Sequence, residues 1–91
     1  MRKKAYRARD VKNVDLAEVL RAVPAGSVWV GMDIGKYEIY VVLRWQNGHF
    51  ERPWKVSNPT QLKLLVALLG KLAESHSMIV ALESTPRASN R

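Results

Sequence analysis

Hydrophobic positions along the chain predict four strands and two helices. Residues 28–34 and 78–82 are apolar at nearly every position, which is typical of strands covered on both faces. Residues 38–45 alternate instead, with Ile39, Val41, Leu43 and Trp45 on one face. Asn47-Gly48 then indicates a hairpin leading to a strand over 49–56. Because Pro53 cannot donate to a ladder, we expect that strand at the sheet edge.

Capping residues mark where both helices begin. Asp15, followed by Glu18, predicts a short helix over about 16–22, which ends before Pro24. Asn58, Pro59 and Gln61 predict the start of a second helix, with Asn58 as its cap and an end near residue 74. Its apolar stripe, Leu62, Leu65, Val66, Leu69 and Leu72, is expected to face the core. Residues 75–77 are expected to form a turn.

The element order is therefore β-β-β-α-β, which indicates an α/β fold with a mixed sheet. A helical crossover places the strand at 78–82 parallel to the strand at 28–34. We expect three segments. Residues 1–27 form a basic N-terminal arm with a short accessory helix, 28–85 form an incomplete α/β domain, and 86–91 form a disordered tail.

The composition of the chain argues against disulfide-bonded, zinc-thiolate and membrane-spanning classes of protein. The 91-residue chain has no cysteine, so it has neither disulfides nor thiolate zinc sites. It contains no apolar run long enough to cross a bilayer and no signal-peptide pattern, so we expect a cytoplasmic protein without a membrane partner.

The net charge of +7 is concentrated at the N-terminus. Residues 1–12 hold six basic residues against Asp10, a balance of +5, and the rest of the chain has a balance of only +2. Such an arm attracts phosphate backbones without reading sequence, although it is equally consistent with a solvated leader. The candidate nucleic-acid-binding residues are Arg2, Lys3, Lys4, Arg7, Arg9 and Lys12, together with Lys36 in the turn after the first apolar strand.

Two carboxylates follow the two apolar strands. Asp33 precedes the Gly35 turn, and Glu83 ends the run at 78–82. Because the carboxyl ends of neighbouring parallel strands share one sheet edge, we expect these side chains to lie together. Such a pair can hold Mg²⁺ for phosphoryl chemistry, although acidic residues also follow strands simply because turns are solvated.

The motifs Val30-Gly31-Met32-Asp33-Ile34-Gly35-Lys36, Val56-Ser57-Asn58-Pro59 and Val80-Ala81-Leu82-Glu83-Ser84-Thr85 resemble the N-terminal part of the DEDD insertion-sequence transposases. The resemblance covers about residues 28–85. It implies a RuvC-like, RNase H-like domain whose catalytic, metal-binding carboxylates include Asp33 and Glu83. It further implies Mg²⁺-dependent DNA cleavage and exchange, with DNA and a guide RNA as partners.

The chain departs from that family after residue 85. The family's two later aspartates and its C-terminal domain do not follow, and Pro86 and Arg87 stand where glycine and an aromatic residue are usual. We therefore expect a truncated fragment of a transposase that binds Mg²⁺ weakly and is inactive alone. We also expect self-association through exposed apolar sheet surface.

Three alternatives remain open. The first is an N-terminal fragment of an actin-like ATPase or sugar kinase, which shares the strand order and the Asp-x-Gly turn. The second is a RuvC-like junction resolvase. The third is a small basic nucleic-acid-binding protein without catalysis. Trp29 and Trp45 lie in strands and are expected to pack there, which leaves Trp54 as the only tryptophan that is a candidate for stacking on bases.

Overall fold

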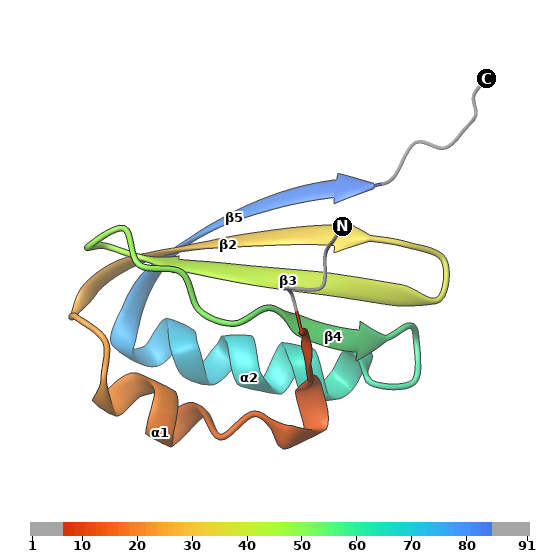
Figure 1. The fold of residues 1–91 in the computed structure, drawn as a ribbon, viewed down its shortest axis with the longest axis horizontal. Helices are drawn as coiled ribbons and strands as arrows, with labels where there is room; N and C mark the ends of the chain where they lie inside the picture. The colour runs from red at the N-terminus through yellow and green to blue at the C-terminus, as the bar shows by residue number, and fades with distance from the viewer. Residues whose placement is uncertain (1–6, 85–91) are drawn as a thin grey trace.

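The computed structural model describes residues 7–84, which form one mixed sheet with helices on one side (Figure 1). The strands are β1 (Arg9–Asp10), β2 (Gly26–Ile34), β3 (Glu38–Trp45), β4 (Trp54–Ser57) and β5 (His76–Ser84). The helices are η2, a 3-10 turn (Val11–Asn13), α1 (Leu16–Arg21) and α2 (Leu62–Ser75). The order across the five-stranded sheet is β1-β4-β3-β2-β5.

The pairing of the strands confirms the predicted α/β class. β3 runs antiparallel to both β2 and β4, whereas β5 runs parallel to β2 after the α2 crossover. The hairpin at Asn47-Gly48 is also present, with Gly48 at a positive φ of 88° that glycine adopts readily.

The prediction that β4 lies at the sheet edge is wrong. The two-residue strand β1 runs parallel beside it, with Arg9 opposite Trp54. Pro53 has no N–H to donate, but its carbonyl oxygen accepts a hydrogen bond from the Arg9 N–H at 2.8 Å. β4 is also shorter than predicted, since only an isolated bridge joins Phe50 to Arg44 before Trp54.

The core lies between the sheet and the helices. Its buried apolar side chains come from η2, α1, α2 and strands β2 to β4, and are Val11, Leu16, Val19, Val28, Val30, Ile39, Val41, Leu43, Trp45, Trp54, Val56, Leu65 and Leu72. Asp15 caps α1 as predicted, because its carboxylate accepts a hydrogen bond from the Glu18 N–H at 3.3 Å.

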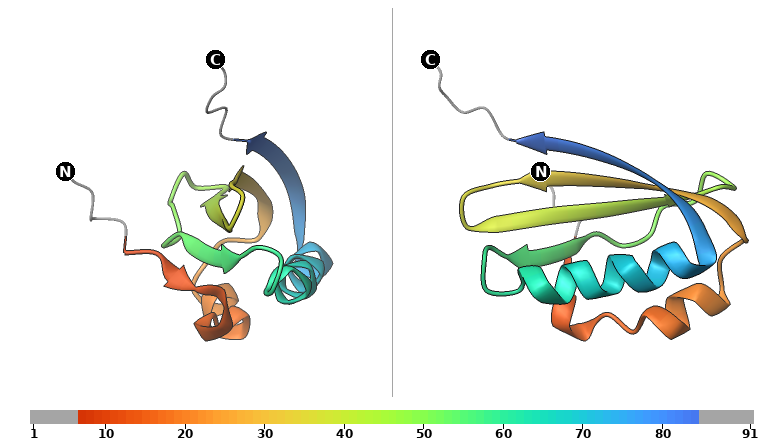
Figure 2. Two further views of the ribbon diagram at one scale, coloured as in Figure 1. Left: turned by 90° about the vertical axis from the view of Figure 1, so that its right-hand side faces the viewer. Right: turned by 180° about the vertical axis from the view of Figure 1, so that it is seen from behind.

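The expected cover on both faces of β2 and β5 is not found. An end-on view shows both helices on the same side of the twisted sheet (Figure 2). Val28 and Val30 face that side and are buried, while Trp29 on the opposite side is only partly buried. The single crossover through α2 covers one face, so the second face stays open over the described residues.

The entry to α2 differs from the predicted cap. The helix begins at Leu62, and the Asn58 side chain donates to the Gly35 carbonyl oxygen at 3.1 Å instead of capping it. Gln61 does reach back, since its Oε1 accepts a hydrogen bond from the Ser57 N–H at 2.9 Å. Asn58 therefore ties the start of the helix to the turn after β2.

The stripe along α2 is only partly buried. Leu65 and Leu72 are fully buried, but Val66 is 63% exposed.

The turn predicted at 75–77 is absent, because α2 passes directly into β5. His76 is buried at this junction, with Nδ1 2.9 Å from Ser75 Oγ and Nε2 2.8 Å from the Pro24 carbonyl oxygen.

Candidate functional site

Asp33 and Glu83 lie side by side on neighbouring parallel strands. The β2–β5 register makes them direct partners, near the carboxyl end of each strand. Register partners project from the same face of a sheet, and adjacent strands are about 4.8 Å apart. Both residues are exposed and lie on the open face, away from the helices. The expectation that the sheet brings these two carboxylates together is confirmed.

A hollow of about 540 Å³ contains both carboxylates. It is lined by residues of β2, β3 and β5, namely Gly31, Met32, Asp33, Tyr40, Val42, Ala81, Leu82 and Glu83. Gly31 leaves space in it, because a Cβ at that position would meet no atom within 4 Å. The two carboxylates therefore share an accessible, largely apolar depression.

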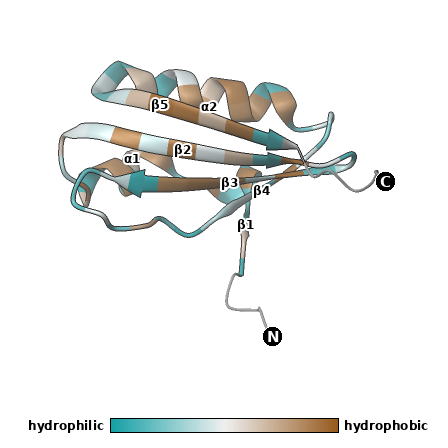
Figure 3. Cartoon of the chain, turned by 90° about the horizontal axis from the view of Figure 1, so that it is seen from above, coloured by the Kyte–Doolittle hydropathy of each residue, from teal (hydrophilic) through white to brown (hydrophobic). Residues whose placement is uncertain are grey.

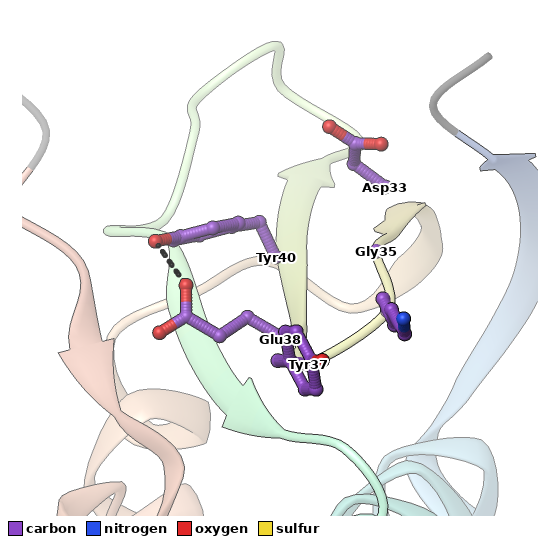
Figure 4. A pocket seen from close by; sticks show the side chains of 6 residues that line it. Asp33, Gly35, Tyr37, Glu38 and Tyr40 are labelled. Atoms are coloured by element: carbon purple, nitrogen blue, oxygen red, sulfur yellow. Dashed lines mark hydrogen bonds between the residues drawn. The ribbon is translucent and has the colours of Figure 1, made fainter. Parts of the chain in front are cut away.

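The turn after β2 places Asp33 at the rim of a second hollow, of about 430 Å³ (Figure 4). Lys36, Tyr37, Glu38 and Tyr40 line it with Asp33 and Gly35. The Gly35 N–H donates to the Glu38 carbonyl oxygen at 2.9 Å, which closes the turn. Asp33 therefore borders both hollows. The closed turn that follows Asp33 restrains the end of β2.

Polar side chains of β3 and β4 lie on the same open face as Asp33. Tyr40 is directly opposite Asp33 in the β2–β3 register, and its hydroxyl donates to Glu38 Oε1 at 3.1 Å. Partial burial raises the pKa of Tyr40, and the hydrogen bond to Glu38 raises it further. Lys55 Nζ lies 3.7 Å from Glu38 Oε2, which brings a positive charge to the same face.

Tyr40 and Lys55 were not among the predicted site residues. The sequence signal that could have identified Tyr40 is the register of the β2–β3 hairpin. Once Ile34 pairs with Ile39, Tyr40 must lie opposite Asp33.

The carboxylate pair fits a hard divalent cation. Mg²⁺ is commonly held by one or two carboxylates, with waters and phosphate oxygens as its other ligands. Asp33 and Glu83 would hold it across the two strands. Within residues 7–84, no group of three or more histidine, cysteine, aspartate or glutamate side chains is arranged around a possible metal position. The described residues therefore offer two protein ligands.

The described basic residues of the N-terminal arm lie far from this pair. Arg9 is in β1, and β4 and β3 separate that strand from β2. At about 4.8 Å per strand, β1 is roughly 14 Å from β2. Arg7 and Lys12 are exposed near β1, and Arg2, Lys3 and Lys4 lie outside the described residues, as does the tail predicted over 86–91. Of the predicted basic residues that the structure describes, only Lys36 adjoins Asp33.

The predicted base-stacking role of Trp54 is wrong. Its side chain is 1% exposed because it faces the core from β4. Trp29 is the tryptophan on the open face, and the Arg44 guanidinium carbon lies 4.8 Å from the centre of its ring. Pro53 suggested an edge position for Trp54, whereas strand alternation decides which face it occupies.

Comparison with protein families, curated proteins and solved structures finds no match to this chain. Among the described residues, no helix has the length and apolar character needed to cross a membrane.

Proposed function

We propose that this chain is a DNA-binding domain of the RuvC-like transposase type, in which Asp33 and Glu83 hold a Mg²⁺ ion against the phosphate backbone. The observation that carries the proposal is their direct pairing on parallel strands β2 and β5. Parallel α/β sheets bind ligands at the carboxyl ends of their strands. The resemblance of residues 28–85 to those transposases assigns the same two carboxylates to the metal.

The surrounding residues suit a phosphate ligand. When bound, Mg²⁺ supplies positive charge that neutralises a phosphate oxygen. Lys36 adds a cationic side chain beside Asp33, since both line the same hollow, while Lys55 adds a second positive charge farther along the same face, where it pairs with Glu38. Gly31 keeps the depression between the strands open to a ligand. Asp33 and Glu83 would hold the cation, and Lys36 would contact the phosphate backbone.

We propose binding without cleavage for this chain alone. Two-metal phosphoryl transfer places two cations about 3.5–4 Å apart. Two carboxylates from the described residues are a small ligand set for that task, so we expect weak Mg²⁺ binding.

Manganese titration monitored by NMR tests the metal site. Paramagnetic Mn²⁺, a substitute for Mg²⁺, should broaden the amide signals around Asp33 and Glu83 first. Asp33→Asn and Glu83→Gln should each abolish this selective broadening. Glu74→Gln, which removes an exposed carboxylate from α2, is the matched control and should leave it unchanged. Equal broadening in Asp33→Asn would refute the metal role.

Salt-dependent binding to duplex DNA tests the nucleic-acid role. Affinity should fall as salt rises, with a slope near −0.9 for each phosphate neutralised. Addition of Mg²⁺ should increase affinity for the parent chain and not for Asp33→Asn. Binding that is indifferent to Mg²⁺ and to Asp33 would instead support a basic binding protein without a metal site. The separation of β1 from β2 makes these two outcomes distinguishable.

A further inference from the structure

Strand β5 is an edge strand with apolar side chains exposed. It is last in the order β1-β4-β3-β2-β5, so within residues 7–84 it pairs on one side only. Ile79 is 49% exposed, Val80 45% and Leu82 63%. Viewed from above, this apolar strand runs along the margin of the sheet (Figure 3). β5 therefore presents both unpaired backbone groups and apolar side chains.

Such an edge is a template for another strand. Half of the N–H and C=O groups of an edge strand point away from the sheet, and a long apolar edge without charges readily pairs with a further chain. β5 is nine residues long, and Glu83 is its only acidic residue, with no lysine or arginine. The middle of the strand offers no charge that would oppose pairing.

We propose that two copies of this chain form a symmetric dimer by antiparallel pairing of β5 with β5, centred on Val80. In this register Val80 lies opposite the partner's Val80. Ile79 lies opposite the partner's Ala81, and Met78 lies opposite the partner's Leu82. The bulky Ile79 thus meets a small side chain, and every central pair is apolar.

Charge placement selects the antiparallel arrangement. Parallel pairing in register would set Glu83 beside the partner's Glu83, and like charges directly opposite each other are destabilising. In the antiparallel register the two glutamates are six residues apart along the strand, or about 20 Å at roughly 3.3 Å per residue. Each lies opposite the partner's Ser77, which carries no charge.

The opposite sheet edge favours a closed dimer over a chain of copies. β1 is only two residues long, so head-to-tail pairing of β1 with β5 would form a very short ladder. β5-to-β5 pairing uses the same surface on both copies and closes with two-fold symmetry. The inference does not depend on the proposed function, because it involves no metal and no nucleic acid.

Cysteine cross-linking tests the register, because the chain has no cysteine of its own. Directly opposite Cα atoms in antiparallel strands are about 4.5–5.5 Å apart, within the range that a disulfide spans. Val80→Cys should therefore form a covalent dimer under mild oxidation. Ile79→Cys is the control of similar exposure, since its copies would be about 8 Å apart and should cross-link at least tenfold more slowly.

Mixing two cysteine variants sharpens this test. Ile79→Cys and Ala81→Cys should each cross-link poorly alone but form a heterodimer readily when mixed. Cross-linking of Val80→Cys no faster than that of Ile79→Cys would overturn the proposed register.

Sedimentation equilibrium tests whether the edge drives association. The parent chain should be in a monomer–dimer equilibrium, and Leu82→Lys should raise the dissociation constant at least tenfold by placing a charge in the apolar ladder. Phe50→Lys is the control, because Phe50 is 62% exposed but lies between β3 and β4. It should leave the constant unchanged. Circular dichroism would establish that both variants fold.

Three results would overturn the dimer. The parent chain could remain monomeric at millimolar concentration, or Leu82→Lys could dimerise as tightly as the parent chain. Open-ended polymers would also contradict it, because they require head-to-tail contacts.

Discussion

Replacing Gly35 by alanine should destabilise the protein through a single contact in the turn that follows Asp33. A Cβ at position 35 would lie 2.9 Å from the Glu38 carbonyl oxygen. That same oxygen accepts the hydrogen bond from the Gly35 N–H, also at 2.9 Å. The carbonyl therefore cannot move away from the new methyl group without weakening the bond that closes the turn.

The expected loss of stability follows from how far the turn must move to relieve this contact. Ordinary carbon–oxygen contacts begin a few tenths of an ångström beyond the present separation, so the β2–β3 turn must open by about that amount. Overpacking of this kind costs about 1–3 kcal/mol. A domain of this size is stable by roughly 5–14 kcal/mol, at about 0.05–0.15 kcal/mol per residue. At about 4–8 °C per kcal/mol, the melting temperature should fall by roughly 4–24 °C.

Gly31→Ala provides a matched control in the same strand. A Cβ there meets no atom within 4 Å, and the substitution reduces the entropy of the unfolded chain. We expect it to be neutral or to stabilise by up to about 1 kcal/mol. Thermal and urea unfolding, followed by circular dichroism, would measure both variants. The predicted clash is absent if Gly35→Ala melts at the same temperature as the parent chain, or if Gly31→Ala loses as much stability as Gly35→Ala.

Two further predictions concern the core and the response to acid. Leu72→Ala should lower the free energy of unfolding by about 2–5 kcal/mol because Leu72 is fully buried, while Val66→Ala should change it by less than about 0.5 kcal/mol in the same urea titrations. The Lys12 backbone N–H and the Gln61 side-chain amide both donate to Asp10 and lower its pKa. The contribution of Asp10 to stability is therefore present above about pH 4 and is lost as pH falls through the lowered pKa. Gln61→Ala should raise that pKa in a carboxylate NMR titration, and an unchanged value would contradict the assignment.

Local pattern determined most of the strands and helices. The alternation over 38–45 predicts both the limits of β3 and its buried face, because side chains of a strand alternate between its two sides. Asp15 marks the start of α1 because its carboxylate reaches a backbone N–H only three residues away. The crossover through α2 made β5 parallel to β2, and this alone brought Asp33 and Glu83 to the same edge.

Contacts between segments far apart in the sequence determined the structural features that the local pattern did not predict. β1 has only two residues, too few for any periodicity, and it is a strand only through its pairing with the neighbouring β4, next to which the Pro53 carbonyl oxygen accepts the Arg9 N–H. Asn58 is a good helix cap in isolation, but its side chain bonds to Gly35, which lies 23 residues earlier. Trp54 and Val66 were misassigned for the same reason, since burial depends on which layer covers each residue.

The sequence by itself thus determined which segments are strands and helices and which two carboxylates share an edge, because those depend on spacing along the chain. Only the tertiary structure decided that both helices cover one face, that the two-residue β1 covers the edge of β4, and that β5 is an apolar edge within residues 7–84. Those properties depend on which surfaces are left uncovered once the layers have packed, and neighbouring residues along the chain do not encode that directly.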